Sequence, residues 1–340
     1  MAIVGSKELS SSKRIDLKTE IPLTCPLVLN IEVANICNSR CIFCPTSDLP
    51  LLKKVGRKAQ IMEESLFYKI IQDCQDAKWR CKMLFFHKDG EPLLHPHIDK
   101  LISFAKKANI ADELQLVTNG IALTPSMTER LINSEVDTIR ISVNGLSQED
   151  YQKQCGISLD YDLFVRNIEN LYRAKGRIRI IVKMIDFGMS AEQRQKFYDL
   201  YSHCSDICAI DDPHGWSSTG EKDYTLGKRN TSFRGHQLDE KKVCPQSFYT
   251  LIINSDGSAG ACCYDWAHQT NFGDLHNQSI QDVWQGKGMY EFRKMHLEHR
   301  RNENPACRNC HAISISRDCL DGYEDEISAR LKAEQESLRC

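Results

Sequence analysis

The chain lacks three features that would place it quickly in a functional class. No segment approaches the roughly 18 to 20 consecutive apolar residues that a membrane span requires. Residues 1–20 are polar and contain no apolar core of a secretory signal. The formal net charge is only −2, so no strongly basic face or charged tail favours nucleic acid. These absences predict a cytoplasmic protein with neither a membrane nor a nucleic acid as its partner.

Cysteine, by contrast, is abundant, with 16 residues in a chain of 340. Disulfides are rare in a reducing cytoplasm, so metal or cluster binding is the natural use of such a set. The hydrophobic content of 41% and the charged content of 26% are ordinary for a globular protein. The length allows one large domain and a smaller one.

Apolar strand-like runs alternate with amphipathic helical segments up to Asp211. The predicted strands cover 26–35, 82–86, 114–118, 137–143, 177–184 and 207–210, and the predicted helices cover 61–77, 96–108, 125–133, 161–174 and 191–201. This alternation favours an α/β fold with a parallel sheet and right-handed crossovers. A long polar loop then precedes a predicted β-hairpin at 249–254 and 259–263, short helices at 279–284 and 289–296, and a terminal helix at 327–336.

Three closely spaced cysteines follow the first predicted strand. Cys37, Cys41 and Cys44 have the spacing C-x3-C-x2-C. Soft thiolates suit iron–sulfur centres, and a simple electron-transfer cluster uses four of them. Three cysteines would leave one iron of a cubane open to a small molecule. The alternatives are a zinc knuckle or unrelated buried cysteines.

This stretch resembles the signature of the radical S-adenosylmethionine (SAM) enzymes, whose open iron binds the amino and carboxylate groups of SAM. The resemblance implies reductive cleavage of SAM to methionine and a 5′-deoxyadenosyl radical. It also implies a partial (β/α)6 barrel similar to a TIM barrel, and an electron donor similar to flavodoxin or ferredoxin. Phe43 matches the aromatic residue that commonly precedes the third cysteine and packs near the adenine.

Further matches to that family follow the second, third and fourth predicted strands, at the end where parallel β/α barrels carry their active sites. The resemblance implies SAM contacts for Gly90, Glu91, Pro92, Thr118, Asn119, Ser142 and Asn144. Asp89 departs from the family's Gly-Gly-Glu-Pro turn, in which the first residue is glycine. The alternative for each Asn-Gly pair is an ordinary turn.

A second cysteine set lies in the C-terminal part. Cys244, Cys262, Cys307 and Cys310 would saturate a cluster, and the predicted hairpin would bring the first two together. A structural zinc site is the alternative. The stretch resembles the twitch domain, the shortened form of the SPASM auxiliary-cluster domain, which implies one auxiliary 4Fe–4S cluster. Cys263 adjoins Cys262 on a predicted strand and should face the other way.

The resemblance divides the chain into five predicted parts. They are a leader at 1–25, the partial barrel at 26–211, a connecting loop at 212–243, a small α+β twitch-type domain at 244–320 and a terminal helix at 321–340.

The expected reaction removes a hydrogen atom from a small molecule, such as a sugar, an aminocyclitol or a related natural-product intermediate, and oxidises it by two electrons. One alternative is epimerisation of the same class of substrate, with Cys155 beyond the fourth strand as the hydrogen donor. A second is peptide modification, ranked lower because only 25 residues precede the first predicted strand. A non-catalytic metal-binding protein is the alternative from another class.

Overall fold

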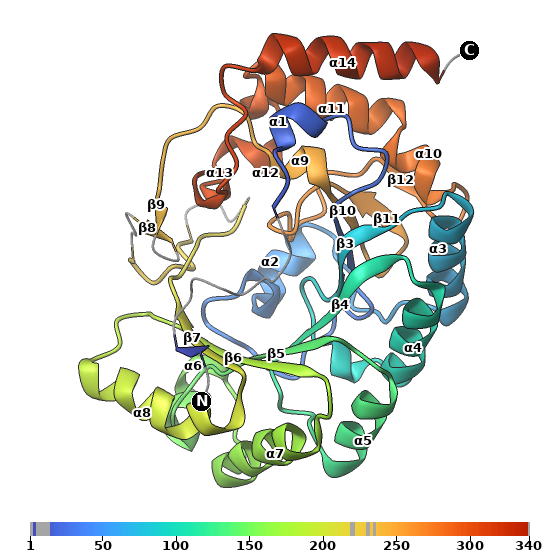
Figure 1. The fold of residues 1–340 in the computed structure, drawn as a ribbon. Helices are drawn as coiled ribbons and strands as arrows, with labels where there is room; N and C mark the ends of the chain where they lie inside the picture. Colours follow the sequence, from blue (N-terminus) through green and yellow to red (C-terminus); the bar gives the residue numbers. More distant parts are fainter. Residues whose placement is uncertain (1–2, 5–13, 218–221, 229–231, 234–235, 339–340) are drawn as a thin grey trace.

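A computed structural model describes residues 3–4, 14–217, 222–228, 232–233 and 236–338 (Figure 1). Within these residues, six parallel strands lie side by side in chain order. They are β2 (Val28–Ile31), β3 (Cys81–Phe86), β4 (Ala111–Thr118), β5 (Thr138–Ser142), β6 (Arg179–Ile185) and β7 (Ile207–Asp211). Consecutive strands pair in parallel, as right-handed β/α units require. The predicted α/β fold with a partial (β/α)6 barrel is confirmed.

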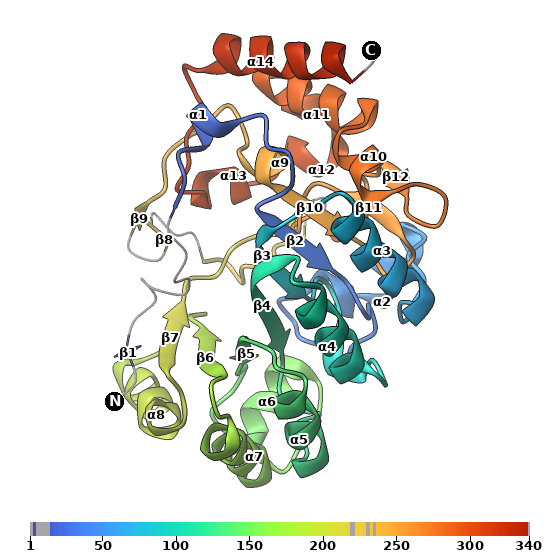
Figure 2. The same ribbon diagram turned by 45° about the vertical axis from the view of Figure 1, so that its right-hand side comes forward.

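Helices cover the outer face of this sheet (Figure 2). They are α3 (Glu64–Asp76), α4 (Ile98–Ala108), α5 (Pro125–Asn133), α7 (Tyr161–Ala174) and α8 (Ala191–Tyr201). Each was predicted, because its apolar residues recur at helical spacing: α4, for example, buries Ile98, Leu101, Ile102 and Ala105. Thr124 caps α5 by accepting a hydrogen bond from the Met127 amide, as its sequence position predicts.

Two further helices, α2 (Leu49–Lys54) and α6 (Gln148–Cys155), were not predicted. Helix α6 is mostly polar and buries only Tyr151 and Cys155, so it carries little hydrophobic periodicity. Short 3-10 turns occur at Pro45–Ser47, Pro92–Leu94, Ser202–Cys204 and Arg301–Glu303.

The C-terminal hairpin extends the barrel sheet. Strand β10 (Thr250–Ile253) pairs in parallel with β2 over four residues, and β11 (Ser258–Gly260) and β12 (Gly273–Asp274) continue the sheet in antiparallel fashion. The hairpin was predicted, but its pairing with β2 was not. This pairing fixes the second cysteine domain against the strand that leads into Cys37.

The rest of the C-terminal part is helical and packs on the N-terminal segment. It contains α9 (Gln246–Tyr249), α10 (Ile280–Trp284), α11 (Lys287–Leu297), α12 (Pro305–Arg308), α13 (Ala312–Ile315) and α14 (Glu324–Ser337). Leu17 of α1 (Leu17–Glu20) shares a small apolar core with Phe248, Leu297 and Leu331. The described part of the predicted leader therefore packs into the fold, and β1 (Ile3–Val4) also pairs with β7.

The connecting segment contains two short antiparallel strands, β8 (Ser232–Phe233) and β9 (His236–Gln237). None of the helices in the described ranges is long and apolar enough to cross a bilayer.

Candidate active site

The first three cysteines lie in the loop that leaves the carboxyl end of β2, at the edge of the sheet where active sites of such folds are built. Hydroxyl groups of the same loop surround their sulfur atoms. Ser39 Oγ lies 3.5 Å from Cys37 Sγ and 3.3 Å from Cys41 Sγ, and Thr46 Oγ1 lies 3.0 Å from Cys44 Sγ. The loop therefore gathers three thiols, and a hydroxyl group lies within hydrogen-bond distance of each sulfur.

Side chains from the ends of two other strands reach this loop. Asn119 Nδ2, after β4, lies 3.7 Å from Cys37 Sγ, and Asn144 Nδ2, after β5, lies 3.9 Å from Cys41 Sγ. Asn119 also donates to Asn38 Oδ1 at 2.8 Å. Ser142 is the last residue of β5 and is half-buried. The structure thus brings the third and fourth strand-end motifs next to the cysteines, although their contacts with SAM stay predictions.

The Gly90–Pro92 turn packs tightly over the backbone that precedes Cys37. A Cβ at Gly90 would lie 2.2 Å from the Ala34 carbonyl oxygen, so no other residue fits without moving the chain. The Glu91 amide donates to the Ile36 carbonyl at 2.8 Å. Pro92 begins the short 3-10 turn that follows. The turn is therefore held directly against the cysteine loop.

The Glu91 carboxylate is buried among three donors. It accepts hydrogen bonds from Thr118 Oγ1 at 2.6 Å, the Asn119 amide at 2.7 Å and the Leu93 amide at 3.0 Å. Burial raises the pKa of Glu91 to about 7, although these hydrogen bonds lower it. Glu91 thus ties the turn after β3 to the end of β4.

This pKa predicts a pH-dependent contribution to stability in protein without SAM. The folded-state pKa exceeds the usual value of 4.5, so the contribution is fully present below pH 4.5 and is lost as the pH rises through 7. Between pH 5 and pH 8, we expect the stability advantage of the wild type over Glu91→Gln to fall by about 2 kcal/mol. Urea denaturation of both proteins at the two pH values measures this difference, and an advantage that grows with pH would contradict the expectation.

Phe43 and Cys155 occupy places that the sequence did not specify. The Phe43 ring stacks on Phe187 with centroids 4.8 Å apart, and the Phe43 carbonyl accepts a hydrogen bond from Trp216 Nε1 at 3.1 Å.

Cys155 is fully buried at the end of α6, and its carbonyl accepts a hydrogen bond from the Arg40 amide at 2.7 Å. The Cys155 thiol, together with burial, raises the pKa of Cys41, so the two side chains are adjacent. A buried thiol next to Cys41 is poorly placed to donate a hydrogen atom to a substrate. The role of Cys155 as a hydrogen donor remains an untested prediction.

Four further cysteines line one cavity in the C-terminal domain. Cys244, Cys262 and the Cys307–Cys310 pair come from three segments there, while Cys263 is not part of the lining. Burial raises the pKa of Cys244 to about 11. Four thiols around one cavity have the donor chemistry of a saturated iron–sulfur cluster or of a zinc site. Cys319 is exposed and lies outside this set.

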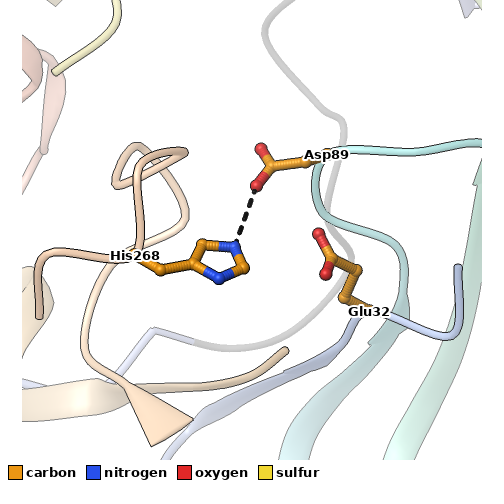
Figure 3. Close-up of side chains that lie close together, drawn as sticks. All are labelled: Glu32, Asp89 and His268. Atoms are coloured by element: carbon orange, nitrogen blue, oxygen red, sulfur yellow. Dashed lines mark ion pairs between the residues drawn. The ribbon is translucent and has the colours of Figure 1, made fainter. Parts of the chain in front are cut away.

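Asp89, which departs from the family's turn, belongs to a buried ionic network between the barrel and the C-terminal domain (Figure 3). Its carboxylate lies 2.9 Å from Lys88 Nζ, 3.0 Å from an Arg57 nitrogen and 3.6 Å from His268 Nε2. Arg57 also pairs with Glu32 at 3.4 Å. Burial alone would raise the pKa of Asp89, but Lys88, His268 and Arg57 outweigh it and hold that pKa below its usual range.

The network ties the two domains together. Lys88 Nζ donates to Asn254 Oδ1 at 3.1 Å and to the Asp265 carbonyl at 2.9 Å, and Arg57 donates to the Trp266 carbonyl at 2.8 Å. On the barrel side, the Asp89 carbonyl accepts from Thr46 Oγ1 at 3.1 Å. A chain of polar contacts therefore runs from the first cysteine loop to the segment that follows Cys262.

Glu32, Asp89 and His268 offer ligand atoms within 4.8 Å of one another, which is compatible in distance with a metal ion. The charges argue against it, because Arg57 and Lys88 already neutralise both carboxylates in a site shielded from water. Sequence reasoning missed this network, since its members are far apart in the chain. The one available signal was the unusual Asp89 itself.

Two family profiles match the chain. The Radical SAM superfamily profile matches residues 31–202, and an iron-sulfur cluster-binding domain profile matches residues 244–311. The first match spans half of the chain and includes the first three cysteines. The second spans all four cysteines of the C-terminal cavity.

Individual relatives are distant. A GTP 3′,8-cyclase of Chlorobaculum tepidum is 28% identical over 141 residues, which are 42% of this chain and only 39% of that protein. The S-adenosyl-L-methionine-dependent 2-deoxy-scyllo-inosamine dehydrogenase of Niallia circulans is 20% identical over 295 residues, which cover 85% of this chain and 94% of that protein.

A similar fold occurs in SuiB of Streptococcus suis, whose structure was solved with the precursor peptide SuiA. The TM-score is 0.61 at 16% identity, over 82% of this chain and 69% of that one. One family assignment follows from the profile match over the barrel. The cysteine loop at the end of β2 and the strand-end motifs around it agree with that assignment. The chain belongs to the radical SAM superfamily and carries a C-terminal iron–sulfur cluster-binding domain.

Proposed function

We propose that this protein is a radical SAM oxidoreductase that oxidises a small-molecule alcohol to a carbonyl by two electrons. The observation that carries the proposal is the second cavity, where four cysteines close one site beside the barrel. A saturated cluster cannot bind SAM, so its natural use is to accept an electron. The similarity to an inosamine dehydrogenase over 94% of its length supports the same class of reaction.

The residues present fit the cofactors of the family. Cys37, Cys41 and Cys44 would hold a 4Fe–4S cluster with one open iron, and the second four cysteines would hold an auxiliary one. SAM bound at the open iron supplies a carbon radical that removes a hydrogen atom from an unactivated C–H bond. The proposed SAM contacts are Phe43, Gly90, Glu91, Pro92, Thr118, Asn119, Ser142 and Asn144.

The chain's own residues have three tasks in this proposal. Glu91 holds the turn after β3 in place through its bonds to Thr118 and Asn119. Asn119 and Asn144 orient amide groups toward the sulfur atoms of the loop. The network around Asp89 keeps the C-terminal domain closed over the carboxyl end of the strands, which helps to exclude water from a reactive radical. The electron for SAM cleavage would come from a donor similar to flavodoxin or ferredoxin.

The direct test is an assay of anaerobically reconstituted protein with SAM and dithionite. The proposal expects about eight irons per chain and formation of 5′-deoxyadenosine. With the correct alcohol, it also expects a product two mass units lighter. A non-catalytic metal-binding protein would produce no 5′-deoxyadenosine. A peptide-modifying enzyme, which the fold shared with peptide-bound SuiB favours, would act on a peptide.

Replacing Cys155 by alanine separates oxidation from epimerisation. Cys155 is fully buried, so we expect Cys155→Ala to leave the yield of oxidised product per 5′-deoxyadenosine within about twofold of the wild type. An epimerase that depends on this thiol would stall, or would release oxidised product that the wild type does not form. The measurement is the product ratio by mass spectrometry, and iron analysis of the variant checks that the adjacent Cys41 still holds its cluster.

A further inference from the structure

Two side chains, His296 and Arg301, line the C-terminal cavity together with the four cysteines. They would not be cluster ligands, because four thiolates already saturate a cluster. His296 of α11 is 1% exposed, and its Nε2 lies 3.7 Å from Cys307 Sγ. The Phe292 ring packs edge-on against the imidazole, with centroids 4.8 Å apart. Arg301 lines the same cavity and donates to the Cys310 carbonyl at 2.9 Å.

The direction of the hydrogen bond from His296 follows from its partner. A ligating thiolate carries no proton and can only accept, so Nε2 must carry a proton. A second proton on Nδ1 would be buried with no acceptor among the described residues, so the geometry favours the neutral tautomer that is protonated at Nε2 alone. The orientation thus directs the one N–H group of the ring at the sulfur of Cys307.

The His296 N–H group and the Arg301 guanidinium both favour the reduced form of a cluster in this cavity. Reduction adds negative charge, which a hydrogen bond to sulfur and a nearby guanidinium both stabilise. Asp265 also lines the cavity and acts in the opposite sense. Its carboxylate, however, accepts hydrogen bonds from Thr270 Oγ1 at 2.7 Å and from the amides of Gln269 and Thr270 at 3.0 Å and 2.6 Å, which disperse its charge.

We propose that His296 and Arg301 are positioning residues that raise the reduction potential of the auxiliary cluster, so that it accepts an electron from the substrate. The inference rests on the proposed two-electron oxidation. In that reaction the substrate-derived hydroxyalkyl radical gives one electron to the oxidised cluster and its hydroxyl proton to solvent. The C=O double bond forms and the cluster is reduced by one electron.

The test is an EPR-monitored redox titration of the full, anaerobically reconstituted chain without substrate. The auxiliary signal is the component that added SAM leaves unchanged. The variants are His296→Phe, which keeps the packing against Phe292, and Arg301→Met, which keeps the apolar stem. His296→Gln retains an N–H donor, and Arg308→Met removes an exposed charge next to Cys307 as a control.

We expect His296→Phe and Arg301→Met each to lower the equilibrium constant for reduction about tenfold, which is a shift of about 59 mV for a one-electron couple. His296→Gln should recover part of the loss, and Arg308→Met should titrate as the wild type. Unchanged potentials in proteins with full iron content would overturn the proposal. If His296→Phe fails to load the cluster, Arg301→Met and His296→Gln still decide, since both must move the potential in the stated direction.

The same measurement separates this inference from the proposed function. Potentials that shift as expected in a protein that never yields a carbonyl product would retain the tuning role and remove the dehydrogenase. Carbonyl formation with unshifted potentials would retain the dehydrogenase and remove the tuning role.

Discussion

Replacing Cys41 by alanine should abolish SAM cleavage while leaving the C-terminal cluster in place. Cys41 is the most buried of the first three cysteines, at 8% exposure, and its sulfur accepts contacts from Ser39 and Asn144. With two thiolates, the loop cannot hold three irons of a cubane. We expect 5′-deoxyadenosine to fall below detection and the iron content to drop from about eight to about four atoms per chain.

A matched control for this loss is Cys319→Ala. Cys319 is exposed and lies outside both cysteine sets, so its removal should leave iron content and SAM cleavage unchanged. If Cys41→Ala protein still released 5′-deoxyadenosine at a rate near that of the wild type, the first cysteine loop would not be the site of SAM cleavage.

Replacing Asp89 by asparagine should produce the largest loss of stability among charge substitutions in the interdomain network. Asparagine keeps the shape but removes the carboxylate that faces Lys88, Arg57 and His268. Lys88 is 1% exposed and Arg57 6% exposed at the side chain, so water cannot replace the lost partner. Removing one member of a buried ion pair costs about 3–5 kcal/mol, and urea denaturation of the cluster-loaded protein measures that cost.

Asp112→Asn provides the comparison, because Asp112 also pairs with two cations, Arg80 and Lys82, but at the surface. Exposed pairs contribute at most about 1 kcal/mol, so this variant should unfold close to the wild-type midpoint. Equal effects of the two substitutions would mean that water reaches Asp89 and that the network does not hold the domains together.

Local patterns in the sequence were sufficient to predict the parallel α/β sheet, while the partial barrel and both cysteine ligand sets were predicted with the family resemblance. Helices α5, α7 and α8 begin and end where their periodicity predicts, and Thr124 caps α5 as predicted, because burial of one face and capping of one end are decided within a few turns. Helix α6 escaped prediction because it buries only two side chains. The spacing of Cys37, Cys41 and Cys44 likewise predicts a cluster-binding loop from the sequence alone, since one short loop carries all three thiols.

The sequence by itself therefore determined the alternation of strands and helices in a parallel sheet, and it predicted which cysteines would be sulfur donors. Only the tertiary structure decided what surrounds those sulfurs. The pairing of β10 with β2 brings the Asp265–His268 segment to Asp89. Helix α6 sets Cys155 next to Cys41, and helix α11 sets His296 next to Cys307. The contact between Asp89 and His268 joins residues 179 positions apart, and short-range periodicity contains no information about such contacts. Electrostatic tuning of a buried site depends on such contacts, because charge and hydrogen bonding act through space and not along the chain.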